Sequence, residues 1–164
     1  MKRISIALCA FLAAAAGSGA AQAATATGTF NVTITITSEC TVTNPTDMAF
    51  GSHGLLTALV NQTSTFQVTC TNTTPYTIGL NAGLNASGSQ RRMLGGVTNT
   101  EFVNYNLYTD AGRTTAWGNA SGSWVSATGN GSAQTYTVYG QVPAQATPSP
   151  GANYQDTVTI TVTY

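Results

Sequence analysis

The sequence predicts an all-β domain, either a sandwich or a barrel. No helical periodicity is visible in the 164 residues, whereas short β-rich runs recur between clusters of Gly, Asn, Pro and Ser. The clearest run spans residues 156–164, where threonines alternate with Val158, Ile160, Val162 and Tyr164. A matching run near the N-terminus alternates Phe30, Val32, Ile34 and Ile36 with polar residues. Two such strands can pair inside one chain, or they can be offered to other copies of it.

The remaining elements follow from the same alternation. Strands are expected at residues 28–37, 40–43, 64–70, 76–82, 105–109, 134–142 and 157–164, with a short edge strand at 93–94. Turn clusters rich in Gly, Asn and Ser separate them at 81–89, 118–122 and 128–132. The proline-rich stretch 142–151 cannot lie inside a sheet, so it is expected to connect the last two strands. One domain without internal repeats is predicted.

The first 23 residues are predicted to be a signal peptide. Lys2 and Arg3 precede a short apolar region, and Ala21-Gln-Ala23 fits the small-residue cleavage signature. Cleavage would leave three arginines and five carboxylates, a net charge of −2, and no lysine. Such a chain offers no basic patch for nucleic acid or anionic lipid.

Two cysteines, Cys40 and Cys70, remain after the predicted cleavage, because Cys9 lies in the leader. In an exported chain such a pair predicts one disulfide, formed in an oxidising compartment. The bond would close a loop of about thirty residues, which the chain-entropy estimate places at roughly 3–4 kcal/mol of stabilisation.

Catalytic and metal-binding chemistry is not expected. The single histidine, His53, lies between glycines and serine in a predicted loop, and no partner acid can be named for it. Two oxidised cysteines and one histidine do not make a metal site, and the acidic residues show no calcium-loop spacing. We therefore expect neither a cofactor nor a small-molecule substrate.

Two tryptophans, Trp117 and Trp124, flank a glycine-containing turn. Exposed aromatic rings could stack on sugars, whereas buried ones would pack the core of the sandwich. Core packing is favoured, because a sandwich of this size needs large side chains inside it.

Three stretches carry a family resemblance. They are Thr27-Gly-Thr-Phe-Asn-Val-Thr-Ile-Thr-Ile36 with Cys40-Thr-Val42 close behind, Tyr105-Asn-Leu-Tyr-Thr-Asp-Ala-Gly-Arg-Thr114, and Tyr154-Gln-Asp-Thr-Val-Thr-Ile-Thr-Val-Thr-Tyr164. With them the chain resembles the spore coat protein U domain family, which includes pilins of archaic chaperone–usher pili. Asp110 and Arg113 of the middle stretch could pair locally, and they are interpreted as parts of a structural turn rather than of a site.

The resemblance implies an immunoglobulin-like β-sandwich that lacks its last strand and is completed by donor-strand complementation. Residues 24–38 would be the donor segment, with Phe30, Val32, Ile34 and Ile36 as the inserted face. Residues 39–164 would form the pilin domain, in which Val158, Ile160, Val162 and Tyr164 line the acceptor groove and contact the chaperone. The implied partners are copies of this chain or related pilins, a periplasmic chaperone and an outer-membrane usher. The implied location is a pilus on the cell surface, reached through the periplasm.

Other functions stay open at this stage. The chain could be a self-complete secreted sandwich that binds carbohydrate through Trp117 and Trp124, or a hydrolase that uses His53. The segment Phe30–Ile36 could also fold back on its own domain.

Overall fold

The computed structural model describes residues 22–151 and 153–164, which divide after Thr35 into an N-terminal part and a compact domain, Ile36–Tyr164. The predicted signal peptide lies outside the described residues, apart from its last two. No helix among the described residues is long and apolar enough to cross a membrane.

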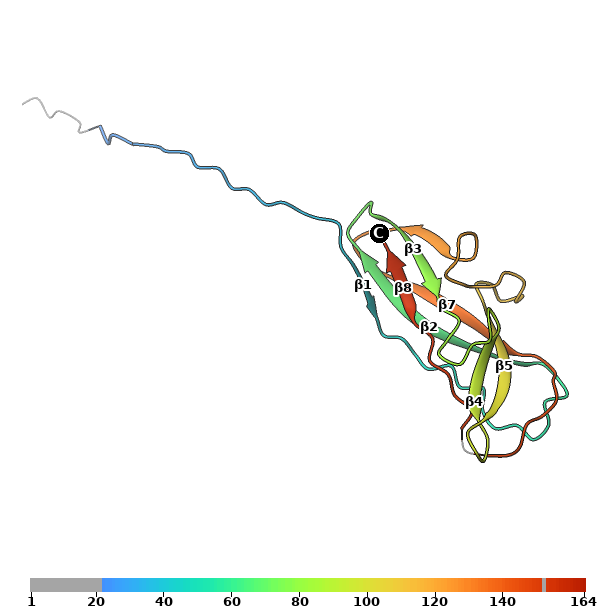
Figure 1. Cartoon of the computed structure of the whole chain (residues 1–164). Coiled ribbons are helices and arrows are strands. Elements are labelled where there is room, and N and C mark those ends of the chain that lie inside the picture. The colour runs from blue at the N-terminus through green and yellow to red at the C-terminus, as the bar shows by residue number, and fades with distance from the viewer. Residues whose placement is uncertain (1–21, 152) are drawn as a thin grey trace, which may run out of the picture. The chain divides into compact units, whose positions relative to one another are not determined.

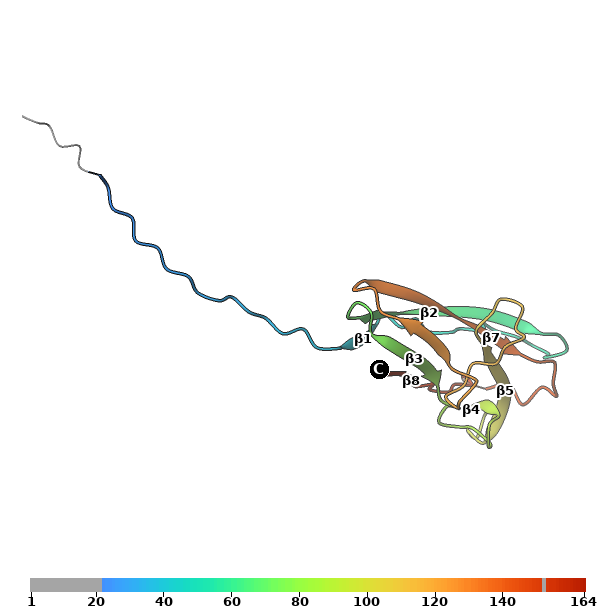
Figure 2. The same ribbon diagram turned by 90° about the horizontal axis from the view of Figure 1, so that it is seen from above.

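The described residues of the domain form eight strands in two sheets. They are β1 (Cys40–Thr43), β2 (Val60–Cys70), β3 (Pro75–Leu80), β4 (Arg91–Gly95), β5 (Glu101–Tyr108), β6 (Val125–Thr128), β7 (Ala133–Val142) and β8 (Ile160–Thr163). The five-stranded sheet has the order β1-β2-β7-β5-β4, and the three-stranded sheet has the order β6-β3-β8 (Figure 1). Every strand pair is antiparallel. In the view from above, β1, β2 and β7 lie on one side, with β3 and β8 on the other (Figure 2). The predicted all-β sandwich is confirmed.

The core lies between the two sheets and is built from alternate residues of the longer strands. Its fully buried centre contains Phe66 and Val68 of β2, Ile78 and Leu80 of β3, and Trp117 from the loop before β6. The Phe66 ring lies 5.9 Å from that of Trp117 and 5.7 Å from that of Tyr136. The period of two in the sequence therefore places one face of each strand in the core.

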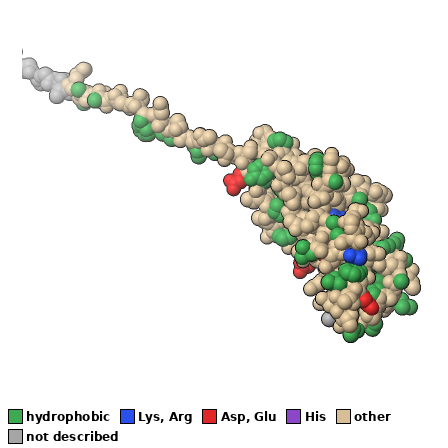
Figure 3. All heavy atoms as spheres, viewed as in Figure 1, with side chains coloured by type: hydrophobic (Ala, Val, Ile, Leu, Met, Phe, Trp, Pro, Cys, Tyr) green, Lys and Arg blue, Asp and Glu red, His purple; other side chains and the backbone are tan. Residues whose placement is uncertain are grey.

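The surface of the domain carries few charges, as the composition predicts. The space-filling view is dominated by uncharged polar side chains and backbone, with isolated blue and red groups (Figure 3). Among the described residues, no side-chain nitrogen or oxygen is both buried and without a hydrogen-bond partner.

The structure corrects the predicted strands in several places. β2 begins at Val60 rather than at 64, and β5 begins at Glu101 rather than at 105. β6 was not predicted, and β8 begins three residues later than expected, at Ile160. The strand predicted at 28–37 is not formed in the single chain, where residues 22–39 have no strand assignment. An isolated segment cannot be a hydrogen-bonded strand, because a strand needs a neighbour to pair with.

Candidate functional site: two open strand edges

The C-terminal strand shows the predicted alternation. Val158, Ile160 and Val162 are partly buried and pack against the core, whereas the threonines between them are exposed. The structure thus brings three of the four predicted acceptor residues onto one face. Tyr164 differs, because its side chain is 59% exposed and lines a shallow depression with residues of β3 and β6.

The outer edge of β8 is open. Within the described residues, β8 pairs only with β3, in the register Leu80↔Ile160 and Ile78↔Val162. The next pair is hydrogen-bonded, since Asn81 donates its backbone N–H to the carbonyl of Thr159 (3.1 Å). Because hydrogen-bonded and non-hydrogen-bonded pairs alternate in an antiparallel ladder, the N–H and C=O groups of Ile160 and Val162 point away from β3. The residues whose side chains face the core therefore present free backbone groups at the edge.

A second open edge belongs to β1, which is an edge strand of the five-stranded sheet. Its hydrogen-bonded pairs with β2 include Glu39 and Thr71, where the Thr71 N–H donates to the Glu39 carbonyl (2.9 Å). The same alternation turns the backbone groups of Cys40 and Val42 away from β2. β1 and β8 also lie within contact distance of each other, although they belong to different sheets. Two edges that no strand of the described part of the chain pairs with thus lie together on one side of the sandwich.

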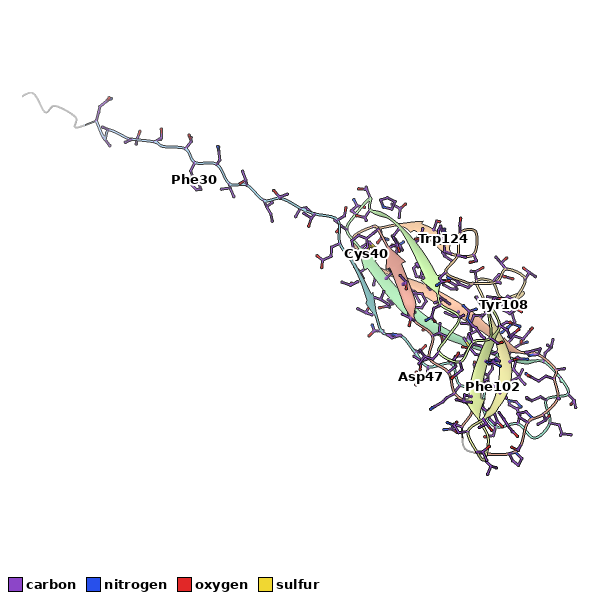
Figure 4. All side chains as sticks on the ribbon, in the orientation of Figure 1. Phe30, Cys40, Asp47, Phe102, Tyr108 and Trp124 are labelled. Atoms are coloured by element: carbon purple, nitrogen blue, oxygen red, sulfur yellow. A yellow bond between two sulfur atoms is a disulfide. The ribbon has the colours of Figure 1, made fainter. Side chains whose placement is uncertain are left out.

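The predicted disulfide is present at this side. Cys40 and Cys70 are direct cross-strand partners in β1 and β2, and their sulfurs are bonded. Figure 4 labels Cys40 at the start of β1. The bond therefore fixes the strand that directly follows the N-terminal segment.

The four predicted donor residues are exposed. Phe30, Val32 and Ile34 are between 84% and 86% exposed, and Ile36 is 68% exposed. Figure 4 labels Phe30 on this segment. Because burying such side chains is favourable, a segment with four of them on one face is suited to pairing with another surface.

A polar cluster that the sequence analysis missed lies where the C-terminal strand begins. Arg91 of β4 is buried, and its Nη2 donates to the carbonyls of Leu80 (2.9 Å), Asn81 (2.7 Å) and Trp117 (2.8 Å). Tyr105 donates its hydroxyl to a carboxylate oxygen of Asp156 (2.7 Å). Burial lowers the pKa of Arg91, while burial and the hydrogen bond to Asp156 raise the pKa of Tyr105. Nothing in the sequence marks Arg91 as buried, because arginines are normally exposed.

Glu101 forms a second polar junction, which holds the loop between β7 and β8. Its carboxylate accepts hydrogen bonds from the Ser149 N–H (2.6 Å), the Ser149 hydroxyl (2.6 Å) and the Tyr154 hydroxyl (2.9 Å). These bonds lower the pKa of Glu101, and the bond from the Ser149 hydroxyl has the largest effect.

This junction predicts a pH dependence. A lowered pKa in the folded state means that Glu101 contributes stability above its unfolded pKa, and that the contribution is lost as the pH falls through the lowered value. We expect the urea midpoint of the wild type to fall more steeply below about pH 4.5 than that of Glu101→Gln. Unfolding curves between about pH 6 and about pH 3 measure this difference. Parallel pH profiles for the two proteins would contradict the assignment.

The structure does not support a carbohydrate site built from both Trp117 and Trp124. Trp117 is buried and donates its indole N–H to the Ile78 carbonyl (2.9 Å), so it cannot stack on a ligand, whereas Trp124 is 41% exposed. Figure 4 labels Trp124 near the start of β6. The carbohydrate-binding hypothesis thus loses one of its two residues.

The ring nitrogen Nε2 of His53 lies 2.8 Å from the Phe50 carbonyl oxygen, at an exposed position. Among the described residues, no group of three His, Cys, Asp or Glu side chains could hold a metal.

The turn after β5 is structural, as the sequence predicts. The Asp110 carboxylate accepts hydrogen bonds from the backbone N–H groups of Thr114 (3.1 Å) and Thr115 (2.7 Å). These bonds lower the pKa of Asp110, and the bond from Thr115 has the largest effect. Arg113 does not pair with Asp110 through its side chain; its Nε donates to the Gly140 carbonyl instead (3.1 Å).

Comparisons with known proteins agree with this architecture. A chain in the crystal structure of the CsuC–CsuE chaperone–tip adhesion subunit pre-assembly complex, from archaic chaperone–usher Csu pili of Acinetobacter baumannii, has a similar fold. The TM-score is 0.56 at 20% sequence identity, over 79% of this chain and 41% of that one. Protein U of Myxococcus xanthus is 36% identical over 107 residues, which is 62% of this chain and 59% of Protein U. The chain therefore spans about three-fifths of this curated relative and about two-fifths of the solved chain.

The fold is thus the expected immunoglobulin-like sandwich. The model of the Spore Coat Protein U domain matches residues 26–161, which include β1, the first two residues of β8 and the N-terminal apolar residues. This chain belongs to the Spore Coat Protein U domain family.

Proposed function

We propose that this chain is a structural subunit of an archaic chaperone–usher pilus, and that it polymerises by inserting its N-terminal segment beside β8 of a neighbouring subunit. The observation that carries the proposal is the open edge of β8, whose core-facing residues Ile160 and Val162 also present unpaired backbone groups. The family membership and the likeness to a chain from a chaperone–subunit complex support it.

The N-terminal segment has the pattern that such an edge requires. Phe30, Val32, Ile34 and Ile36 recur at every second residue, as do Val158, Ile160, Val162 and Tyr164 of the receiving strand. An added strand would bond its backbone to the edge and turn these four side chains toward the core. Burying them would contribute roughly 6–12 kcal/mol at about 1.5–3 kcal/mol each, before the costs of ordering the segment.

The contact is heterologous, because the segment of one copy meets the domain of the next. Contacts of this type do not close on themselves unless the rotation between subunits forms a ring, so they generate fibres. We propose that this fibre lies on the cell surface and serves adhesion and biofilm formation.

Assembly would need two further partners before the fibre forms. An exposed strand edge with an apolar face aggregates unless something covers it. A periplasmic chaperone would occupy the edge of β8 until the subunit reaches an outer-membrane usher, after export directed by residues 1–23. The chaperone would contact the same residues as the donor segment, Val158, Ile160, Val162 and Tyr164.

A peptide experiment tests the proposal. The acceptor is the mature chain with Ile34→Asp, which disables its own segment, and the ligand is a synthetic peptide of residues 27–38. We expect the peptide to raise the melting temperature by on the order of 10 °C when its concentration is a hundred times Kd.

Two matched peptides serve as controls. The peptide with Ile34→Asp should give no shift, whereas the peptide with Thr35→Asp, which adds the same charge on the opposite face, should keep most of it. If the acceptor ignores the wild-type peptide, the sandwich is complete by itself and the proposal is wrong.

A further inference from the structure

The carboxylate of Asp156 joins the beginning of the C-terminal strand to both sheets. Its Oδ1 accepts hydrogen bonds from the backbone N–H groups of Leu84 (2.9 Å) and Asn85 (3.1 Å), in the loop that follows β3. Its Oδ2 accepts from the hydroxyl of Tyr105, on β5 of the other sheet (2.7 Å). A single side chain thus ties residue 156 to the three-stranded sheet through the loop and to the five-stranded sheet directly.

The loop after β3 is shaped around this carboxylate. Gly83 has a φ of +85°, and a Cβ at this position would overlap Oδ2 of Asp156. Only glycine both adopts this backbone conformation without strain and leaves the space that the carboxylate occupies. The close approach shows that the loop and Asp156 pack as one unit.

Arg91 fixes the end of β3, the strand that pairs with β8, close to where Asp156 fixes the start of β8. Its guanidinium donates to the carbonyls of Leu80 and Asn81, at the end of β3 where the pairing with β8 starts. Asp156 and Arg91 therefore hold the two strands at the point that sets their register.

β8 itself, which begins after these anchors, is hydrogen-bonded to a neighbouring strand on one side only. Before it, Gln155 exchanges two backbone hydrogen bonds with Leu94 of β4 (2.9 and 3.0 Å), and Thr159 donates its N–H to Oδ1 of Asn81 (2.9 Å). From Ile160 onward, the only strand that pairs with β8 within residues 22–151 and 153–164 is β3. A slip of one residue would turn Ile160 and Val162 outward, because the side-chain period is two. While the outer edge is empty, the anchors around residue 156 oppose such a slip together with the pairing to β3 and the packing of Ile160 and Val162 against the core.

We propose that Asp156 is a positioning residue for strand uptake: its carboxylate sets the register of β8, so that the open edge is formed before a donor strand arrives. This inference rests on the proposed function, since it concerns how the same edge receives the N-terminal segment of a second copy. Asp156 itself would not touch the incoming strand.

The test measures association and dissociation rates of the peptide 27–38 on the mature chain with Ile34→Asp, with and without a further change at Asp156. Asp156→Ala should lower the association rate constant about tenfold, because only the fraction of molecules with the correct edge can bind. The dissociation rate constant should change less than about twofold, because the bound strand then holds β8 in register. Asp156→Asn, which keeps an oxygen for Leu84 and Asn85, should restore part of the association rate.

A variant in a strand that does not pair with β8 separates positioning from general stability. Val138→Ala, in the buried centre of β7, should lower the melting temperature without changing the association rate. If Asp156→Ala leaves the association rate unchanged, or if Val138→Ala lowers it equally, the inference is overturned. Should Asp156→Ala fail to fold, Tyr105→Phe removes only the hydroxyl donor, and a slower association is again the expected result.

Hydrogen exchange distinguishes a failure of this inference from a failure of the proposed function. If the peptide does not bind even with Asp156 intact, strand uptake is wrong. The exchange of the β8 amides of Thr161 and Thr163 then still tests the register. We expect at least tenfold faster exchange at these amides in Asp156→Ala, relative to the amides of β7. Equal exchange at β8 in both proteins would overturn the positioning role.

Discussion

Replacing Ile34 by aspartate is expected to abolish head-to-tail assembly of the mature chain while leaving the domain folded. Ile34 is 84% exposed in the single chain, so the folded domain loses no packing. In the fibre the same side chain would be buried among apolar residues. The change removes roughly 1.5–3 kcal/mol of apolar burial and adds the larger cost of burying an unpaired carboxylate.

The matched control is Thr35→Asp, which adds the same charge one residue further on, where the side chain faces away from the core of the acceptor. Sedimentation velocity of concentrated mature protein should show polymers for the wild type and for Thr35→Asp, and monomers for Ile34→Asp. The combined loss corresponds to at least a hundredfold weaker association. Polymers formed by Ile34→Asp at wild-type concentrations would refute insertion of this face.

Replacing Trp117 by alanine is expected to lower the free energy of unfolding of the domain strongly. Trp117 is 1% exposed, its ring packs against Phe66, and its indole N–H bonds to the Ile78 carbonyl (2.9 Å). Truncation of a buried tryptophan typically costs about 3–5 kcal/mol, and it leaves the carbonyl of Ile78 without this donor. Whole domains have about 5–15 kcal/mol of stability, so this loss is a large fraction of the free energy of unfolding.

Trp124 provides the matched control, since it is the other tryptophan of the chain and is 41% exposed. Urea unfolding followed by circular dichroism should show a much lower midpoint for Trp117→Ala and a small change for Trp124→Ala. A variant Trp117→Ala as stable as the wild type would contradict the core position. The same pair would also test carbohydrate binding, because loss of ligand binding in a folded Trp124→Ala would revive that hypothesis for this residue alone.

The parts of the fold that follow simple alternation could be predicted from the sequence. The strands around Phe66, Tyr76, Val138 and Ile160 all contain alternating apolar residues, and each is present. β6 was missed because Val-Ser-Ala-Thr is short and only weakly apolar. β4 was recognised only at Met93 and Leu94, because it begins with two arginines, which propensity places in solvent.

Of the candidate site, the sequence predicted the apolar strand residues but not the polar contacts around Asp156 and Arg91. The alternation of Val158, Ile160 and Val162 is visible in the sequence, and so is the disulfide pair. The polar half depends on groups far apart in the chain: Asp156 bonds to Tyr105 and Leu84, and Arg91 bonds to backbone carbonyls. Backbone acceptors leave no mark in a sequence, so burial of Arg91 could not have been inferred. The late start of β8 has a similar cause, since Gln155 bonds to Leu94 of β4, and the chain first bonds beside β3 at Thr159, whose carbonyl accepts from Asn81.

The disulfide between Cys40 and Cys70 also determines how the protein would carry tension. In a fibre pulled lengthwise, force would enter each subunit through the segment that precedes Cys40. β1 has only four residues, so its hydrogen bonds to β2 alone would make a weak mechanical link. The covalent bond passes the load directly to Cys70, at the end of the eleven-residue β2, whose ladder with β7 spans ten residue pairs in the middle of the five-stranded sheet. The strongest part of the domain, rather than its outermost strand, would thus bear the pull.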